Sequence, residues 1–138
     1  MSDWKTPLRL VEQLDKKGNI HEKGVKKLVS AVAEASELGD KLGCAEFIAF
    51  ATSAVRSAHN SEAVLDEVEK QTGVRLQILS GVEEAQLTFL SARRWYGWSA
   101  GRITNLDIGG GSLELSTGTD EHPDLAFSLD LGAGRLTH

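Results

Sequence analysis

A turn of three glycines and a serine holds the clearest chemical signal in this sequence. Gly109, Gly110, Gly111 and Ser112 separate two apolar segments, LDI before them and LEL after them. Successive glycines allow backbone conformations closed to residues with a Cβ, and no side chain keeps a phosphate group from the backbone N–H groups. The turn therefore indicates phosphate binding, and the alternative is a plain hairpin with a tight turn.

Two carboxylates flank this turn. Asp107 is delivered to it by the preceding strand, and Glu114 follows Ser112 by two residues, so on extended strands their side chains point to the face of a bound ligand. Mg²⁺ binds carboxylate oxygens, waters and substrate phosphate together. We therefore expect Asp107 and Glu114 to hold a divalent cation beside the phosphate.

The residues around the turn exclude two other phosphate loops. No Lys follows the glycines, so the turn is not a P-loop. After the turn, Leu113, Leu115 and Thr117 alternate with polar or small residues at period two, which predicts a strand. A dinucleotide-binding turn would open a helix instead. The expected arrangement is strand, glycine turn and strand.

Composition bounds the class of protein. The 138 residues are 41% hydrophobic and 25% charged, which suits a globular chain with one core. A net charge of −5 argues against a nucleic-acid partner, which usually meets a basic face. The sequence has no signal-peptide core and no run of about 18 apolar residues, so we expect no membrane partner and a cytoplasmic location.

Hydrophobic periodicity predicts alternating helices and strands. Gly43 supplies a stop for the first long helix, and Asn60 or Ser61 can cap a second helix that Gly73 closes. This order implies an α/β domain with a largely parallel sheet that ends in an antiparallel hairpin. The expected elements are helices over 21–42, 60–72 and 82–96, a buried strand over 45–51, strands over 74–79 and 102–108, and two strands after the glycine turn.

Ligands in such sheets bind beyond the carboxyl ends of the strands. The first predicted strand leads to Thr52, Ser53 and Arg56, whose hydroxyl, backbone N–H and guanidinium groups suit a phosphate. The second leads to Glu83 and Glu84. Each group has a simpler explanation by itself. Arg56 could be an ordinary surface arginine, and Glu83 and Glu84 could be favoured by the macrodipole at the start of a helix. Their shared location at the strand ends favours a site.

Four segments together resemble the exopolyphosphatase and guanosine pentaphosphate phosphohydrolase family. The resemblance implies an α/β fold of the ribonuclease H-like, actin-type ATPase class, with a mixed sheet flanked by helices. It also implies hydrolytic release of orthophosphate from the end of inorganic polyphosphate, or of the 5′ γ-phosphate from guanosine pentaphosphate. The segments are ATSAVR (51–56), SGVEEAQL (80–87), DIGGGSLEL (107–115) and SLDLGAGRLT (128–137).

The resemblance also implies roles for individual residues. Glu84 matches the family's catalytic glutamate, which would orient or deprotonate water, and Arg56 matches the arginine that grips the terminal phosphoryl group. The family's metal-associated acids fall on Asp107 and Glu114, with Mg²⁺ or another divalent cation as the implied cofactor. The phosphate-binding residues are then Thr52, Ser53, Gly109, Gly110, Gly111 and Ser112.

One part of the family pattern has no match. Family members begin with a first phosphate loop of the type D-x-G-S-N-S, and nothing before Trp4 resembles it. We therefore expect a fragment, in which 1–100 is the later part of a first actin-like domain and 101–138 holds the opening strand, phosphate-loop hairpin and start of a second. A sheet lacking the first phosphate-loop strand exposes its edges, which suggests a homodimer. The isolated chain is expected to be weakly active or inactive.

Other functions stay open at this level. The same loops would serve a non-catalytic module that binds polyphosphate or guanosine penta- and tetraphosphates. An ATP-dependent kinase or a chaperone-like ATPase would share the fold, although the EEA segment and the lack of an adenosine-pocket signature count against it. Polyphosphate and guanosine pentaphosphate stay equal candidates for the substrate.

Overall fold

The computed structural model describes residues 3–136, so Thr137 of the fourth motif lies outside the described residues. The chain forms two compact units, one ending at Ile78 and the other beginning at Leu79. The expectation of one core is therefore wrong. The main apolar cluster draws all its buried residues from the part of the chain up to Leu76, and the later part packs a helix on a sheet of its own.

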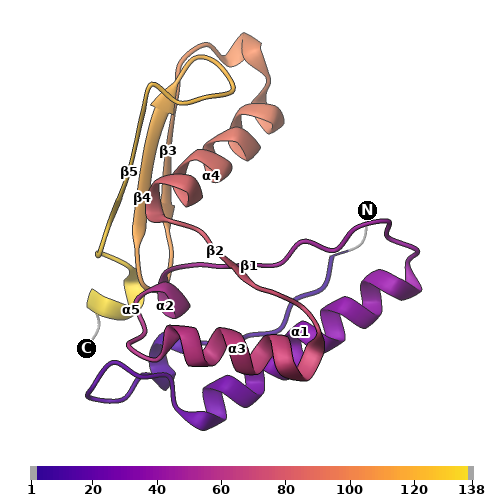
Figure 1. The fold of residues 1–138 in the computed structure, drawn as a ribbon. Coiled ribbons are helices and arrows are strands. Elements are labelled where there is room, and N and C mark those ends of the chain that lie inside the picture. The colour runs from indigo at the N-terminus through magenta and orange to yellow at the C-terminus, as the bar shows by residue number, and fades with distance from the viewer. Residues whose placement is uncertain (1–2, 137–138) are drawn as a thin grey trace. The chain divides into compact units, whose positions relative to one another are not determined.

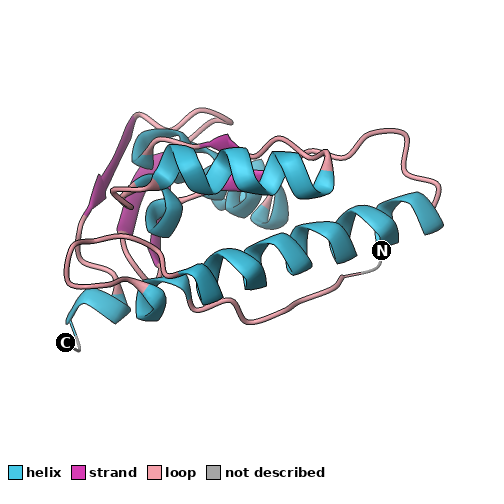
Figure 2. Cartoon of the chain, turned by 60° about the horizontal axis from the view of Figure 1, so that its bottom comes forward, coloured by secondary structure: helices cyan, strands magenta, loops and turns pink. Residues whose placement is uncertain are grey.

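The first unit is built around two helices that lie side by side (Figures 1 and 2). Both begin and end close to their predicted bounds, and Gly73 ends the second helix in the left-handed conformation, with φ 71°. None of the helices within residues 3–136 has the length and apolar character needed to cross a membrane. The elements are a 3₁₀ turn (η1, Leu10–Gln13), α1 (Glu22–Lys41), β1 (Phe50–Ala51), α2 (Ser53–Arg56), α3 (Ser61–Thr72) and β2 (Gln77–Ile78).

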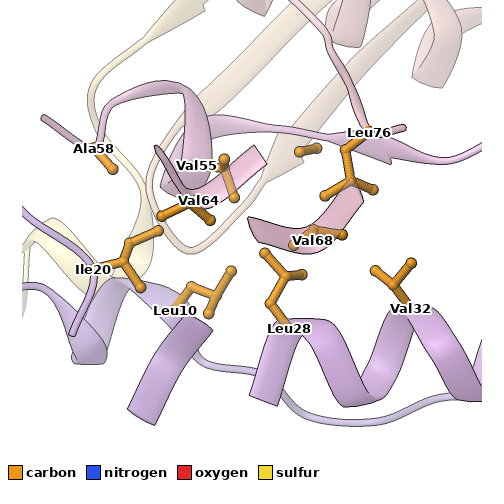
Figure 3. Close-up of a cluster of buried hydrophobic side chains, with 10 residues drawn as sticks. Leu10, Ile20, Leu28, Val32, Val55, Ala58, Val64, Val68 and Leu76 are labelled. Carbon is orange, nitrogen blue, oxygen red and sulfur yellow. The ribbon is translucent and has the colours of Figure 1, made fainter. Parts of the chain in front are cut away.

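Apolar side chains at helical spacing form the core of this unit (Figure 3). Leu28 and Val32 of α1 belong to the same buried cluster as Val64 and Val68 of α3. Val55 of α2 joins them, which fixes the short segment that carries Arg56. Full burial of one such side chain stabilises a fold by about 1.5–3 kcal/mol, so this cluster is the main source of the unit's stability.

Of the two predicted caps, Asn60 or Ser61, Asn60 occupies the position before α3, but its side chain makes no capping hydrogen bond. Its Oδ1 accepts a hydrogen bond of 2.9 Å from the Ile20 N–H, and its Nδ2 donates one of 3.1 Å to the Ile20 carbonyl. An amide carries a donor and an acceptor together, so it can pair with both groups of one peptide edge. This pairing joins the start of α3 to the segment before α1.

The two strands of the first unit are shorter and more exposed than predicted. They run parallel, with Phe50 opposite Gln77 and Ala51 opposite Ile78. The expectation of a buried strand over 45–51 is wrong, because Phe47, Ile48 and Phe50 are all exposed. A sheet of two strands leaves each strand with one free edge, and no described strand lies beyond them.

The second unit packs one helix along an antiparallel sheet (Figure 1). The strands lie in the order β3-β4-β5, so the parallel and antiparallel pairs form separate sheets and the expected single mixed sheet is wrong. Short connections between consecutive strands favour hairpins, whereas parallel pairing needs a long crossover. The elements are α4 (Gly81–Tyr96), a 3₁₀ turn (η2, Trp98–Ala100), β3 (Ile103–Ile108), β4 (Leu113–Gly118), β5 (Leu125–Leu129) and α5 (Ala133–Leu136).

The two faces of this sheet differ in polarity. The face toward α4 carries polar side chains, and the register places Asp107, Glu114 and Ser128 side by side across the three strands. The opposite face is apolar, and much of it is exposed: Leu106 keeps 54% of its surface and Ile108 keeps 59%. Alternation along the strands therefore puts the polar groups inside, beneath the helix.

Arg93, near the C-terminal end of α4, fills the space between the helix and the sheet at the end away from the glycine turn. It is 0% exposed, and its guanidinium donates to the carbonyls of Gly97 at 3.2 Å, Gly101 at 2.7 Å and Gly118 at 2.9 Å. Its charged group also lies over the Phe89 ring, 5.8 Å from the ring centre. A buried cation needs such partners, and here they tie the end of α4 to the sheet.

Candidate phosphate and metal site

The glycine turn between β3 and β4 uses its carbonyl groups inside the protein. Gly109 donates its N–H to the carbonyl of Ser112, while the carbonyls of Gly109 and Gly110 accept from the N–H groups of Ala133 and Gly134, each at 2.9 Å. Among residues 3–136, the N–H groups of Gly110, Gly111 and Ser112 donate to no protein group. Buried N–H groups are rarely left unpaired, and Gly111 and Ser112 are buried while Gly110 is exposed, so the turn has free donors that suit an anion.

The three turn glycines are not required for a left-handed backbone. The described glycines with positive φ lie elsewhere, so this part of the argument from sequence is wrong. The close approach that the structure shows is made by another glycine, Gly132. A Cβ on Gly132 would lie 2.4 Å from both the carbonyl carbon of Gly111 and the nitrogen of Ser112, which no real side chain tolerates. Glycine at 132 therefore lets the segment before α5 pack directly on the turn.

Asp107 and Glu114 lie directly opposite each other in the β3–β4 register, so their side chains share the face toward α4. Directly opposite residues have Cβ atoms about 4.5–5.5 Å apart. Glu114 is only 1% exposed, and its Oε1 accepts a hydrogen bond of 2.7 Å from the Ser128 hydroxyl. The buried Ser112 hydroxyl has no hydrogen-bond partner among the described residues.

This set of oxygen atoms fits a hard divalent cation. Two carboxylates and an orphaned hydroxyl beside the glycine turn are the ligand types that Mg²⁺ takes together with waters and phosphate oxygens. Within residues 3–136 there is no group of three or more acidic, histidine or cysteine side chains that could hold a metal by itself.

Glu84 lies at the same end of the sheet as the turn. The C-terminal part of α4 contacts the start of β3, and Asn105 Nδ2 lies 3.4 Å from the Thr88 hydroxyl on the helix. One helical turn back from Thr88 is about 6 Å, and two strand residues beyond Asn105 are about 6.6 Å. Glu84 therefore lies toward the Asp107 end of β3, and it is half-buried.

The neighbouring Glu83 has a different task. Its Oε2 accepts from the Ser80 N–H at 2.7 Å, and its own N–H donates to the Ser80 hydroxyl at 3.2 Å, which forms a capping box. Hydrogen bonding to the Ser80 side chain, and then to its backbone N–H, lowers the pKa of the Glu83 carboxyl. The helix-end explanation therefore accounts for Glu83, and a catalytic role for Glu84 stays a prediction.

The other predicted residues belong to the first unit. Thr52, Ser53 and Arg56 follow β1 directly, as expected, and the Thr52 carbonyl accepts from the N–H groups of Val55 at 3.1 Å and Arg56 at 3.0 Å. Ser53 is buried, and Arg56 is half-buried. Glu84, Asp107, Glu114 and the turn belong to the second unit. That both groups act on one substrate stays a prediction.

Sequence reasoning missed two residues that support the site. Ser128 holds Glu114, and Gly132 packs on the turn. Ser128 could have been found from strand alternation, because it shares a face with Glu114 once the β4–β5 register is known. Gly132 had a weaker signal, its place in the LGAG segment after the last strand.

Comparison with known proteins decides the family. The model of the Ppx/GppA phosphatase family matches residues 1–138. The chain belongs to this family. Among curated Ppx/GppA relatives, exopolyphosphatase 1 of Mycobacterium leprae is 61% identical over 137 residues, which is 99% of this chain and 40% of the relative. The resemblance inferred from the four motifs is therefore confirmed.

Solved structures of Ppx/GppA relatives share the fold. An exopolyphosphatase from Cytophaga hutchinsonii superposes with a TM-score of 0.81 and 27% identity, over 88% of this chain and 39% of that one. An exopolyphosphatase-like protein gives a TM-score of 0.83 and 31% identity, over 94% of this chain and 43% of that one. The chain thus has the α/β fold of these Ppx/GppA structures and spans about 40% of the length of the relatives it matches.

Proposed function

We propose that this chain is part of a metal-dependent hydrolase that releases orthophosphate from the end of inorganic polyphosphate or the 5′ γ-phosphate of guanosine pentaphosphate. The observation that carries the proposal is the glycine turn, where three unpaired N–H groups lie beside two carboxylates on one sheet face. The relative from M. leprae is named an exopolyphosphatase, which supports the same substrate class.

The turn would bind the phosphate and the carboxylates would hold the metal. Oxygens of the terminal phosphate accept hydrogen bonds from the N–H groups of Gly110, Gly111 and Ser112. Asp107 and Glu114 are the ligands for Mg²⁺ or another divalent cation, which neutralises charge on the phosphate when bound. Phosphoryl transfer to water depends mainly on positioning and charge neutralisation, and these groups provide both.

The remaining residues would act on the water and on the transferred group. Glu84 orients the attacking water and accepts its proton, as the family resemblance implies and as its place toward the Asp107 end of β3 allows. A carboxylate of ordinary basicity suffices when the water is already aligned with the bond to be broken. Arg56 grips the terminal phosphoryl group, and Thr52 and Ser53 supply further donors. The inference for these three rests on the family resemblance.

The same proposal includes the finer architecture. The ribonuclease H-like, actin-type fold would place 1–100 in a first domain and 101–138 in a second. A homodimer is part of the proposal as well, since β3 and β5 are the edge strands of their sheet and have no outer partner among the described residues.

A chimera tests the catalytic assignment. This chain replaces the matching 137-residue stretch of the M. leprae exopolyphosphatase, and orthophosphate release is measured from polyphosphate and from guanosine pentaphosphate with Mg²⁺. Glu84→Gln should lower the rate by about 10²–10⁴-fold, the range for loss of a general base. Glu83→Gln is the matched control, because glutamine also completes a capping box, and it should retain the parental rate.

Two outcomes would contradict the proposal in different ways. Equal rates for the Glu84→Gln and Glu83→Gln chimeras would remove Glu84 from catalysis. A chimera that binds pyrophosphate through the turn but releases no orthophosphate would favour the alternative, a non-catalytic module that binds polyphosphate or guanosine phosphates. The unpaired N–H groups of the turn suit such a module equally well.

A further inference from the structure

The segment from Ser128 to Gly134 has no task in the proposed chemistry, although it forms most of the fourth sequence motif. It nevertheless makes several contacts with the turn and its carboxylates. Ser128 donates to Glu114, Gly132 packs on the peptide between Gly111 and Ser112, and the next two N–H groups donate to turn carbonyls.

The hydrogen bonds from this segment decide which way the peptides of the turn face. The carbonyls of Gly109 and Gly110 point toward α5, because the N–H groups of Ala133 and Gly134 donate to them. If the peptide after Gly110 turned over, its carbonyl would face a bound phosphate and repel it, and the hydrogen bond from Gly134 would break. The contacts therefore keep donors, and not acceptors, available to an anion.

Gly132 sets the distance between the segment and the turn. An added Cβ would lie 2.4 Å from Ser112 N and 2.5 Å from Gly111 N, so any side chain forces the two pieces of backbone apart. The hydrogen bonds from Ala133 and Gly134 follow directly after this contact. Separation at Gly132 would therefore lengthen both of them.

Ser128 restricts the carboxylate of Glu114. The hydrogen bond to Oε1, at 2.7 Å, leaves Oε2 as the oxygen that can turn toward a cation. Groups that hold a metal ligand in this way commonly change metal affinity by about 10–100-fold when they are removed. Ser128 lies opposite Glu114 in the β4–β5 register, so this contact is built into the sheet.

We propose that residues 128–134 form a positioning element that orients the N–H groups of the turn and the Glu114 carboxylate for a phosphate–metal ligand. This inference rests on the proposed function of the turn. In this inference Gly132 affects binding through the N–H groups of the turn, and Ser128 affects it through the Glu114 carboxylate. Neither residue needs to touch the ligand.

The test uses the 138-residue chain labelled with ¹⁵N and titrated with inorganic pyrophosphate and Mg²⁺. In the parent chain, the amide signals of Gly110, Gly111 and Ser112 should shift on binding. Gly132→Ala should weaken binding by about tenfold or more, as expected when hydrogen bonds to a charged group are lost. Gly118→Ala is the matched control, because its Cβ would meet Pro123 Cα at 2.9 Å, at the other end of β4. It should bind pyrophosphate like the parent.

A second pair of variants keeps the test decisive if Gly132→Ala fails to fold. Ser128→Ala should raise the Mg²⁺ concentration at half-maximal binding by about tenfold, and Ser128→Thr, which keeps the hydroxyl, should restore the parental value. Parental binding by both Gly132→Ala and Ser128→Ala would overturn the positioning inference and leave the proposed function standing. No shift of the turn amides in the parent chain would overturn both.

Discussion

The two units of this molecule bury different kinds of side chain. The unit that ends at Ile78 has an interior of aliphatic residues, with Ser53 as its one buried polar residue among those described. In the unit that begins at Leu79, the fully buried side chains are mostly polar, and the apolar side chains of its sheet lie largely on the exposed face. Besides glycines, the buried residues of the second unit are Ala85, Phe89, Arg93, Ser112, Glu114 and Ser116.

This difference suggests that the aliphatic interior of the first unit mainly stabilises the fold, whereas the polar interior of the second unit serves binding or reaction. An aliphatic interior stabilises a fold in proportion to the area it removes from water. Buried polar groups stabilise little, and they are costly unless every one is paired. Among the described residues, the Ser112 and Ser116 hydroxyls and Arg93 Nε have no partner in the second unit, against the Ser61 hydroxyl in the first, so the second unit carries more polar groups that packing alone does not explain. Proteins keep such groups where they bind or react.

The largest effect is expected from Arg93→Leu. The change would leave the carbonyls of Gly97, Gly101 and Gly118 without their donor, and we expect it to reduce the free energy of unfolding by about 3–5 kcal/mol. Urea unfolding followed by amide NMR signals measures the loss in each unit separately. The signals of α4 and β3–β5 should disappear at lower urea than in the parent.

Leu28→Ala is the counterpart in the first unit, where it should cost about 2–5 kcal/mol by opening a cavity in the aliphatic core. Its effect should fall on the signals of α1 and α3. If either variant unfolded both units at the same urea concentration, the two interiors would form one cooperative structure. The contrast between an aliphatic and a polar unit would then not describe separate folding units.

A smaller effect of opposite sign is expected from Glu114→Gln. Glu114 is buried and receives a single described hydrogen bond, from Ser128, which a glutamine oxygen can also accept. Removing the buried charge should raise the free energy of unfolding by about 1 kcal/mol. The same change should abolish the Mg²⁺ dependence of pyrophosphate binding, which calorimetry measures. A clear loss of stability would show that Glu114 supports the fold.

The smallest effect is expected on the acid dependence of stability, through the Glu83 carboxyl at the start of α4. The folded pKa of Glu83 lies below its ordinary value of 4.5, because Ser80 hydrogen-bonds its carboxylate. The stabilisation is therefore present above pH 4.5 and is lost as the pH falls through the folded pKa. Ser80→Ala removes the hydroxyl and keeps the backbone N–H, so it should reduce this acid dependence, seen as a flatter unfolding midpoint below pH 4.5. An unchanged pH profile would exclude the capping box as its source.

Local pattern was enough to predict most helices and the site turn. The period of apolar residues places α1, α3 and α4 within a residue or two of their bounds, and Gly73 ends α3 as expected. The strand, turn and strand around Gly109 are also confirmed. These features depend on residues close together in sequence, which is why period and glycine placement suffice.

Apart from the backbone conformation of the turn glycines, the errors involve partners that are distant in the sequence. A run such as that around Phe47 predicts a strand but not what covers it. Arg93 occupies the buried stripe of α4 at helical spacing from Ala85 and Phe89, and only the three-dimensional fold shows the carbonyls that make this position acceptable for a cation. Gly132 likewise owes its importance to a contact with a turn that precedes it by two strands.

The strand pairing described above has a kinetic consequence. In the second unit, Ile108 pairs with Leu113 across a short turn, whereas in the first unit Phe50 meets Gln77 only after α2 and α3 have been made. Contacts between residues near in sequence close with less loss of chain entropy and so form faster. On refolding from denaturant, the β3–β5 meander should therefore appear before the β1–β2 pair, in the reverse of the order in which a ribosome makes them.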